Sequence, residues 1–178
     1  MRWSDWSCMH VILTGTPGTG KTEAGIILKT KGYDVRNVKD LAAEFGAASE
    51  TDEGMEIDVA LLTNLLPHSE EIIIIEGHLA HLLPNDLCIV LRCNPNVLRE
   101  RLEARGYPED KVRENMEAEA IDLILVEAFE SCDRVFEIDA SDLDPDGVAQ
   151  AIENVINGDA DGRSPGSVDW SQVVMDWY

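Results

Sequence analysis

Residues 15–22, with the sequence GTPGTGKT, have the residue types and spacing of a phosphate-binding loop. They match G-x-x-x-x-G-K-[ST] at every position, and they lie between an apolar strand-like run and a helix-like segment. In such a loop the backbone N–H groups point inward and, together with the helix N-terminus, form an anion site. The pattern therefore predicts a site for the phosphates of a nucleoside triphosphate.

The same pattern predicts which groups of this loop touch the ligand. Lys21 is expected to reach the β- and γ-phosphates, and the hydroxyl of Thr22 is expected to bind Mg²⁺. Main-chain contacts to the phosphates are expected from Gly18, Thr19, Gly20 and Glu23. ATP and Mg²⁺ are therefore the expected ligands.

A second stretch with chemical content is residues 71–78, EIIIIEGH. Four consecutive isoleucines are typical of a central parallel strand that is buried on both faces. We expect this strand beside the phosphate-loop strand, with its carboxyl end facing the bound phosphates. Glu76 would then hold the water shell of Mg²⁺. His78 is expected on the same side, to position water, relay a proton or sense the γ-phosphate.

Two arginines on a later helix-like segment are candidates for a lid. Arg101 and Arg105 are spaced i, i+4, so they occupy one helical face. Arg105 precedes a Gly-Tyr-Pro break, where closure of a lid over residues 94–111 would bring its charge onto the transferring phosphoryl group. The alternative is a solvated face of ion pairs with neighbouring glutamates.

These groups need an alternation of strands and helices to position them. Strands are expected at residues 10–14, 33–36, 72–75, 87–91 and 135–138, and helices at residues 21–31, 38–45, 58–66, 94–105, 109–130 and 148–156. Residues 46–56 are polar and contain glycine, so a loop is expected there. The alternation predicts a three-layer α/β P-loop NTPase with a five-stranded parallel sheet.

A chain of 178 residues is expected to form one principal domain. We assign residues 9–157 to the P-loop kinase domain and residues 1–8 to an N-terminal extension. From residue 158 the composition turns to Gly, Asp and Ser, which predicts an acidic flexible tail to residue 178.

The charge balance limits the possible partners. The chain has 35 acidic residues against 14 lysines and arginines, a formal net charge of -21. Such a surface repels nucleic acid and anionic membranes, so no direct contact with either is expected. The acidic excess indicates a protein of a salt-rich cytoplasm, as in a halophile. The alternative is a solvated acidic face in ordinary cytosol. No secretion signal or membrane-spanning run is evident, so a cytoplasmic protein is expected.

The combination of GTPGTGKT, the strand-end IEGH and LRERLEARGY followed by an acidic helix resembles the adenylate kinase isoenzyme six family. This archaeal and eukaryotic family includes the coilin-interacting nuclear ATPase and the archaeal proteins called putative adenylate kinases. The resemblance covers roughly residues 9–130. It implies a nucleoside monophosphate kinase fold with a small lid.

The resemblance also implies a function. We expect broad-specificity phosphoryl transfer from ATP to AMP-like nucleotides, together with ATPase activity. We also expect a role in small-subunit ribosome maturation and rRNA processing through one platform ribosomal protein. It implies ATP contacts from residues 18, 20–23 and Arg105, a lid at about residues 104–114, and an acceptor segment from Asn37 to about residue 60. Few basic residues lie near that segment, so Arg92, at the end of the fourth strand, is a hypothesis for gripping the acceptor phosphate, with Arg101 as a further candidate.

Two other functions remain open at this stage. The first is an ATP-hydrolysing assembly switch that binds a ribosomal protein and has little true kinase activity; His78 beside Glu76 favours it. The second is a kinase of a small metabolite, of the shikimate or gluconate type, which keeps the phosphate loop and lid but changes the acceptor.

Overall fold

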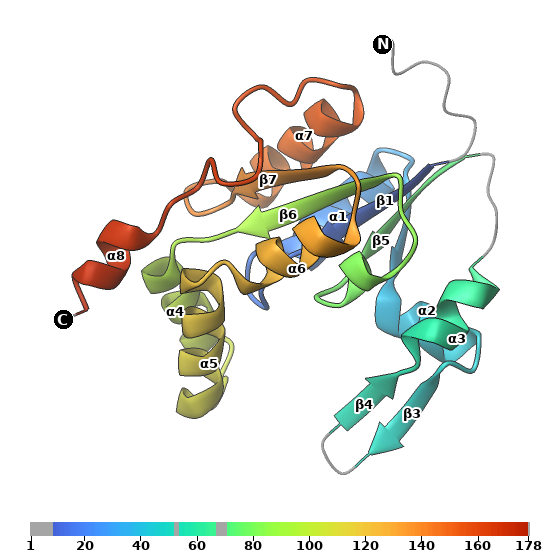
Figure 1. The fold of residues 1–178 in the computed structure, drawn as a ribbon, viewed down its shortest axis with the longest axis horizontal. Helices are drawn as coiled ribbons and strands as arrows, with labels where there is room; N and C mark the ends of the chain where they lie inside the picture. Colours follow the sequence, from blue (N-terminus) through green and yellow to red (C-terminus); the bar gives the residue numbers. More distant parts are fainter. Residues whose placement is uncertain (1–8, 52–53, 67–70, 178) are drawn as a thin grey trace.

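A computed structural model describes residues 9–51, 54–66 and 71–177, and Figure 1 shows the arrangement of its elements. The predicted extension at residues 1–8 lies outside the described residues. At the centre is a five-stranded parallel sheet with the strand order β2-β5-β1-β6-β7. The strands are β1 Met9–Thr14, β2 Asp34–Asn37, β5 Ile72–Glu76, β6 Leu87–Arg92 and β7 Val135–Asp139. The predicted P-loop α/β fold is confirmed.

The isoleucine run forms β5, and β5 lies directly beside β1, as the sequence predicts. The two strands are parallel, with Met9 opposite Ile72 and Leu13 opposite Glu76. The central isoleucines are buried because helices cover both faces of the strand. The register brings Glu76 to the same edge of the sheet as the loop that follows β1.

Alternate residues of β1 contribute to two separate cores, which gives the molecule three layers. Val11 and Leu13 pack with α1 (Lys21–Thr30) and α7 (Pro145–Ile156) on one face. Ile12 packs on the other face, where the covering helices are α2 Val38–Glu44, α3 Val59–Leu65 and α6 Leu123–Ser131, with the short 3₁₀ helix η2 Ala80–Leu82 beside them.

Residues 46–56, expected to be a loop, instead include an antiparallel hairpin. Its strands are β3 Ala48–Thr51 and β4 Gly54–Ile57, and they extend away from the main sheet (Figure 1). The strands are short and mostly exposed, so their residues lack the apolar alternation that marks a strand buried on one face.

The single helix expected at residues 109–130 is two helices, α5 Glu109–Ala120 and α6. The chain turns at Asp122, which adopts a left-handed conformation with φ 58°. Aspartate tolerates this conformation better than most residues do, and its carboxylate also bonds to Arg92. Neither glycine nor proline marks the turn, so its sequence signal is weak.

The chain beyond α7 returns to the sheet, in contrast to the loose tail that its composition predicts. The backbone N–H of Glu137 donates to the carbonyl of Arg163 at 2.9 Å. The side chain of Trp170 is buried, and the short helix α8 Ser171–Met175 follows it. No helix of the described residues is long and apolar enough to cross a membrane.

Candidate active site

The loop between β1 and α1 is shaped by glycines that approach other elements closely. A Cβ atom on Gly15 would lie 2.3 Å from the carbonyl oxygen of Leu91. A Cβ atom on Gly18, whose φ is 94°, would lie 2.8 Å from the side chain of Leu98 on α4 (Pro95–Ala104). Only glycine fits these two positions without displacing β6 or α4.

Lys21 begins α1 and folds back over the loop. Its Nζ atom donates to the carbonyl oxygens of Gly15 at 2.7 Å and Thr16 at 3.0 Å. The side chain is buried, and this burial lowers the pKa of Lys21 to about 8, although Glu76 and Glu119 act in the opposite direction. The ammonium group is thus held at the loop where phosphates are expected.

Oxygen atoms suited to a hard cation converge beside Lys21. The hydroxyl of Thr22 lies 3.4 Å from Oε2 of Glu76, and Oε1 of Glu76 accepts a hydrogen bond from Nδ2 of Asn37 at 2.7 Å. A hydroxyl and a carboxylate are ligand types that Mg²⁺ accepts directly or through water. The residues present therefore fit Mg²⁺, with Thr22 and Glu76 as the groups that would hold it.

His78 follows Glu76 after a sharp turn at Gly77, where a Cβ atom would lie 2.3 Å from Val38. The imidazole is half-buried. Burial is the main cause that lowers the pKa of His78, and the positive charges of Lys21 and Lys39 lower it further. His78 is therefore largely neutral at pH 7 and able to accept a proton.

His81 packs beneath the turn at Gly77 and helps to hold its backbone in place, a role that the sequence did not predict. It is fully buried, with Nδ1 3.2 Å from the hydroxyl of Thr14 and Nε2 3.2 Å from a carboxylate oxygen of Glu127. The Thr14 hydroxyl also donates to the carbonyl of His78 at 3.3 Å. The buried imidazole and the end of β1 thereby fix the backbone that carries His78.

A cavity of about 260 Å³ lies in front of the loop. Most of the predicted site residues line it: Gly18, Gly20, Lys21, Thr22, Glu23, Asn37, Glu76, His78 and Arg105. Lys39 and Tyr107 also line it. The structure therefore brings together side chains from α1, β2, β5 and the segment after α4.

A second cavity of about 360 Å³ borders the same loop. Gly18, Gly20, Glu23 and Arg105 line both cavities, so the two are adjacent. An apolar wall is specific to the second one and consists of Ala104, Ala140, Leu143, Pro145 and Val148. Sequence reasoning did not find this wall, because its apolar residues come from α4, α7 and the segment between β7 and α7 and follow no recognisable motif.

The three candidate arginines are placed differently. Arg105 forms an ion pair with Glu23 beside the loop. Arg101 lines the second cavity and donates to the carbonyls of Ala140 at 2.9 Å and Ser141 at 3.0 Å. Arg92 is only 1% exposed and lines neither cavity, a position that differs from the predicted contact with an acceptor phosphate.

Comparisons of the sequence with known proteins identify a family and close relatives. The AAA domain family matches residues 11–122. A protein of Archaeoglobus fulgidus named "Putative adenylate kinase" is 44% identical over 172 residues, covering 94% of this chain and 95% of that protein. A protein of Methanosarcina acetivorans with the same name is 40% identical over 186 residues, covering 93% of this chain and 100% of that protein.

Solved structures with low sequence identity share the fold. Shikimate kinase from Acinetobacter baumannii in complex with shikimate has a TM-score of 0.57 at 15% identity, covering 85% of this chain and 94% of that one. The YorR protein from Bacillus subtilis in complex with phosphorylated GDP has a TM-score of 0.59 at 14% identity, covering 83% and 95%. At this level of identity the likeness concerns the fold alone.

Proposed function

The chain belongs to the adenylate kinase-like family of P-loop proteins, and on that premise we propose that it is a broad-specificity nucleoside monophosphate kinase converting ATP and AMP to two ADP. The observation that carries the proposal is the convergence of Lys21, Glu76 and Arg105 on one cavity beside the phosphate loop. A second, partly apolar cavity adjoins the first along that loop and has room for a base.

The phosphate loop would hold the triphosphate through its inward N–H groups, with Lys21 neutralising the β- and γ-phosphates. When bound, Mg²⁺ would supply charge neutralisation to the same oxygens. The hydroxyl of Thr22 and the carboxylate of Glu76 would hold it, and the hydrogen bond from Asn37 would orient that carboxylate.

The second cavity suits the adenine and ribose of ATP. Leu143, Pro145 and Val148 offer an apolar surface to one side of a base. The planar guanidinium of Arg101, held by two backbone carbonyls, lies in the same wall and can stack on a base. The phosphates would then extend from this cavity into the loop.

The acceptor would approach from the opposite side of the loop, along the segment from Asn37 to about residue 60. That segment contains β3, β4 and α2, and α2 begins at the wall of the first cavity. Lys39 and His78 line the cavity there. A cationic side chain at this wall, in a chain with net charge -21, favours an anionic acceptor such as a monophosphate.

The segment after α4 would act as the lid, at about residues 104–114. Arg105 ends α4, and Gly106 follows with φ 75°. Closure would transfer Arg105 from Glu23 to the phosphoryl group, where its charge stabilises the transition state. Closure would also exclude water, so that hydrolysis competes less with transfer.

A second candidate function is an ATP-hydrolysing switch that binds a basic protein of the small ribosomal subunit during its maturation. The lowered pKa of His78 favours it, because a neutral imidazole near the γ-phosphate is able to accept a proton from water. The acidic surface would steer a basic partner in a salt-rich cytoplasm. A small-metabolite kinase is a third candidate, consistent with the shikimate kinase-like fold.

One experiment separates these functions. The protein is mixed with MgATP in concentrated KCl, with and without AMP, and ADP is quantified separately from free phosphate. AMP-dependent formation of two ADP per ATP, lost in Lys21→Ala, supports the kinase. Phosphate release at a rate that does not depend on AMP supports the switch. Phosphoryl transfer only to a non-nucleotide acceptor supports the metabolite kinase.

A further inference from the structure

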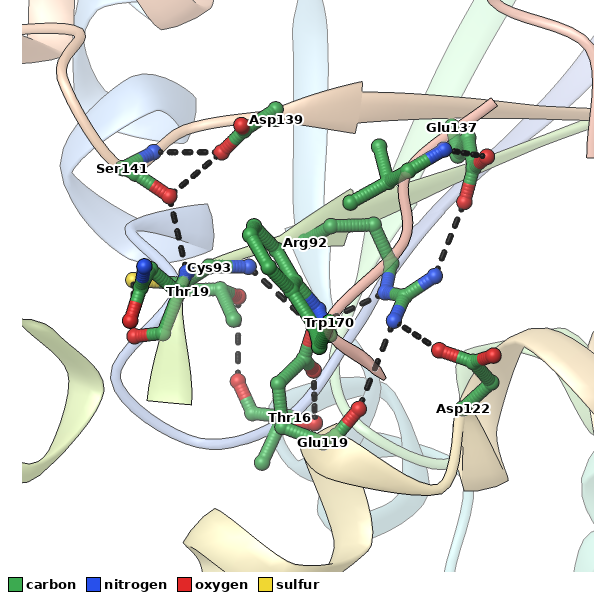
Figure 2. Close-up of polar contacts among 12 residues, drawn as sticks. Thr16, Thr19, Arg92, Cys93, Glu119, Asp122, Glu137, Asp139, Ser141 and Trp170 are labelled. Carbon is green, nitrogen blue, oxygen red and sulfur yellow. Dashed lines mark hydrogen bonds and ion pairs between the residues drawn. The ribbon is translucent and has the colours of Figure 1, made fainter. Parts of the chain in front are cut away.

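An ionic cluster that is buried except for the carboxylate of Asp122 lies beside the phosphate loop, and the proposed function leaves it without a role. We name it the Arg92 cluster: Arg92, Glu119, Asp122, Glu137 and Trp170 (Figure 2). Arg92 donates from Nε to Glu119 and from Nη1 to Glu137, each at 2.8 Å, and its Nη2 bonds to Asp122. The indole of Trp170 lies over the guanidinium, 6.0 Å from Cζ to the ring centroid.

Glu119 is the member that reaches the phosphate loop. It lies near the end of α5, is 2% exposed, and accepts four hydrogen bonds from three separate segments of the chain. The donors are Thr16 Oγ1 at 2.6 Å, Arg92 Nε at 2.8 Å, Trp170 Nε1 at 3.1 Å and the Cys93 N–H at 3.2 Å. Because burial removes water as a partner, the orientation of this carboxylate depends on these donors.

Thr16 connects this carboxylate to the nucleotide site. Its hydroxyl donates to Oε2 of Glu119, while its carbonyl oxygen accepts from Nζ of Lys21 at 3.0 Å. A shift of Glu119 therefore moves the same residue whose backbone holds the phosphate-binding lysine. Figure 2 shows Thr16 and Glu119 in contact below the Arg92 side chain.

The C-terminal segment closes the cluster from the other side. Oε1 of Glu137 accepts hydrogen bonds from the hydroxyl of Ser167 at 3.0 Å and the backbone N–H of Val168 at 2.7 Å. These bonds anchor the chain just before Trp170, whose indole N–H then reaches Glu119. Residues 163–170 thus run as a strap from β7 to the end of α5.

We propose that Glu119 is a positioning residue for the phosphate loop and that the strap, through Trp170, sets the affinity for MgATP. The inference rests on the proposed function, because it requires that the loop binds ATP. The path consists of three hydrogen bonds between buried groups: from Trp170 to Glu119, from Thr16 to Glu119, and from Lys21 to Thr16. A contact at the C-terminal segment would therefore change the affinity of the phosphate loop for MgATP.

A cluster that merely holds the fold together would lower stability when altered but leave nucleotide affinity of the folded protein unchanged. The test therefore measures the Kd for MgATP by calorimetry under conditions where urea titration shows each variant to be folded. Thr16→Val removes the hydroxyl and keeps the side-chain shape, and Trp170→Phe removes the indole N–H and keeps an aromatic ring. Each is expected to raise the Kd about three- to tenfold, the size expected for one hydrogen bond.

Two matched variants serve as controls. Trp177→Phe removes an indole N–H that bonds to Asn96 outside the cluster, and it should bind MgATP like the wild type. Thr16→Ser restores the hydroxyl and should restore most of the affinity. Should Thr16→Val fail to fold, Thr16→Ala replaces it, because both lack the donor.

The double variant Thr16→Val with Trp170→Phe decides whether the two residues act along one path. Coupled residues give non-additive effects, so the double variant should bind little worse than Thr16→Val alone. Additive effects, or wild-type affinity in both single variants, would overturn the inference while leaving the proposed function intact. A wild-type protein that fails to bind MgATP contradicts the proposed function itself, and the inference with it.

Discussion

The side chain of Asn37 donates a hydrogen bond to Glu76 at 2.7 Å, although 39 residues separate them in the chain. The two residues face each other at the carboxyl ends of the neighbouring parallel strands β2 and β5. Asn37 also caps α2 by accepting from the backbone N–H of Lys39. The start of the proposed acceptor segment is thus bonded to the proposed Mg²⁺ carboxylate.

Glu76→Gln should lower kcat for ADP formation by about 10- to 100-fold, the range found when an outer ligand of a metal site is changed. The amide keeps the shape of the side chain but removes the charge that would hold the hydrated Mg²⁺. Steady-state rates at varied Mg²⁺ measure the effect. Glu130→Gln, at an exposed position of α6, is the control, and equal rates in both variants would contradict a metal role.

Substitution of Glu23 should strengthen nucleotide binding, whereas substitution of Arg105 should slow turnover. Glu23→Gln frees Arg105 and removes a negative charge beside the phosphates, so the Kd for MgATP should fall about two- to fivefold, as expected for an exposed pair. Arg105→Ala should lower kcat by about 100-fold or more, because the charge for the transferring group is lost. Calorimetry and initial rates measure the two effects. If Glu23→Gln does not bind MgATP more tightly and Arg105→Ala does not turn over more slowly, Arg105 has no part in the mechanism.

His78→Asn should distinguish hydrolysis from transfer. The lowered pKa of His78 leaves the imidazole neutral at pH 7, and general base catalysis of this kind contributes about 100-fold or more. Phosphate release without AMP should therefore fall by at least about tenfold, and ADP formation with AMP should fall less. Parallel assays of both products measure the ratio. An equal loss of both activities would instead assign His78 to phosphate binding.

Arg92→Ala should lower the free energy of unfolding by about 3–5 kcal/mol, because it leaves the carboxylates of Glu119 and Glu137 buried without their cation. Urea unfolding at fixed salt measures the change. Arg99→Ala, which breaks an exposed pair with Glu103, should leave stability nearly unchanged. If the Arg92→Ala protein is as stable as the wild type and has a raised KM for AMP, the result would instead support the hypothesis that Arg92 binds the acceptor phosphate.

Cys132 should be alkylated by iodoacetamide before Cys88 and Cys93. Hydrogen bonds from Cys88 and then Asn85 outweigh partial burial and lower the pKa of Cys132 to about 7, whereas burial raises the pKa of Cys93 to about 11. Thiolate is the reactive form, so the rate at Cys132 should be small below pH 6 and half-maximal near pH 7. Mass spectrometry of peptides measures each site, and Asn85→Ala should shift the half-maximal pH upward.

Earlier reaction of Cys93 than of Cys132, or a rate at Cys132 that first rises above pH 9, would contradict the geometry around Cys132. The peptide map also separates Cys8, which lies outside the described residues.

The elements that the sequence predicted well are those that local rules specify. The four isoleucines fit only a strand buried on both faces, and the glycines before Lys21 fit a loop that closes on α1. The hairpin at β3 and β4 was missed, because exposed short strands have no apolar face to reveal them. The break at Asp122 was missed because a long-range bond to Arg92 accompanies it, without a local turn residue such as glycine.

The sequence alone determined the phosphate loop, the strand beside it and the placement of Glu76 and His78 at the sheet edge, since these follow from short motifs and from the geometry of parallel strands. Only the tertiary structure decided that Arg92 faces inward to Glu119 and Glu137, that the apolar residues of α4, α7 and the segment between β7 and α7 line one cavity, and that Trp170 returns to Glu119. Those contacts join residues up to 51 positions apart, as in the bond between Trp170 and Glu119, and no local pattern specifies which buried charge meets which. Pairing of buried groups is fixed by packing, because each must find its partner where water is excluded.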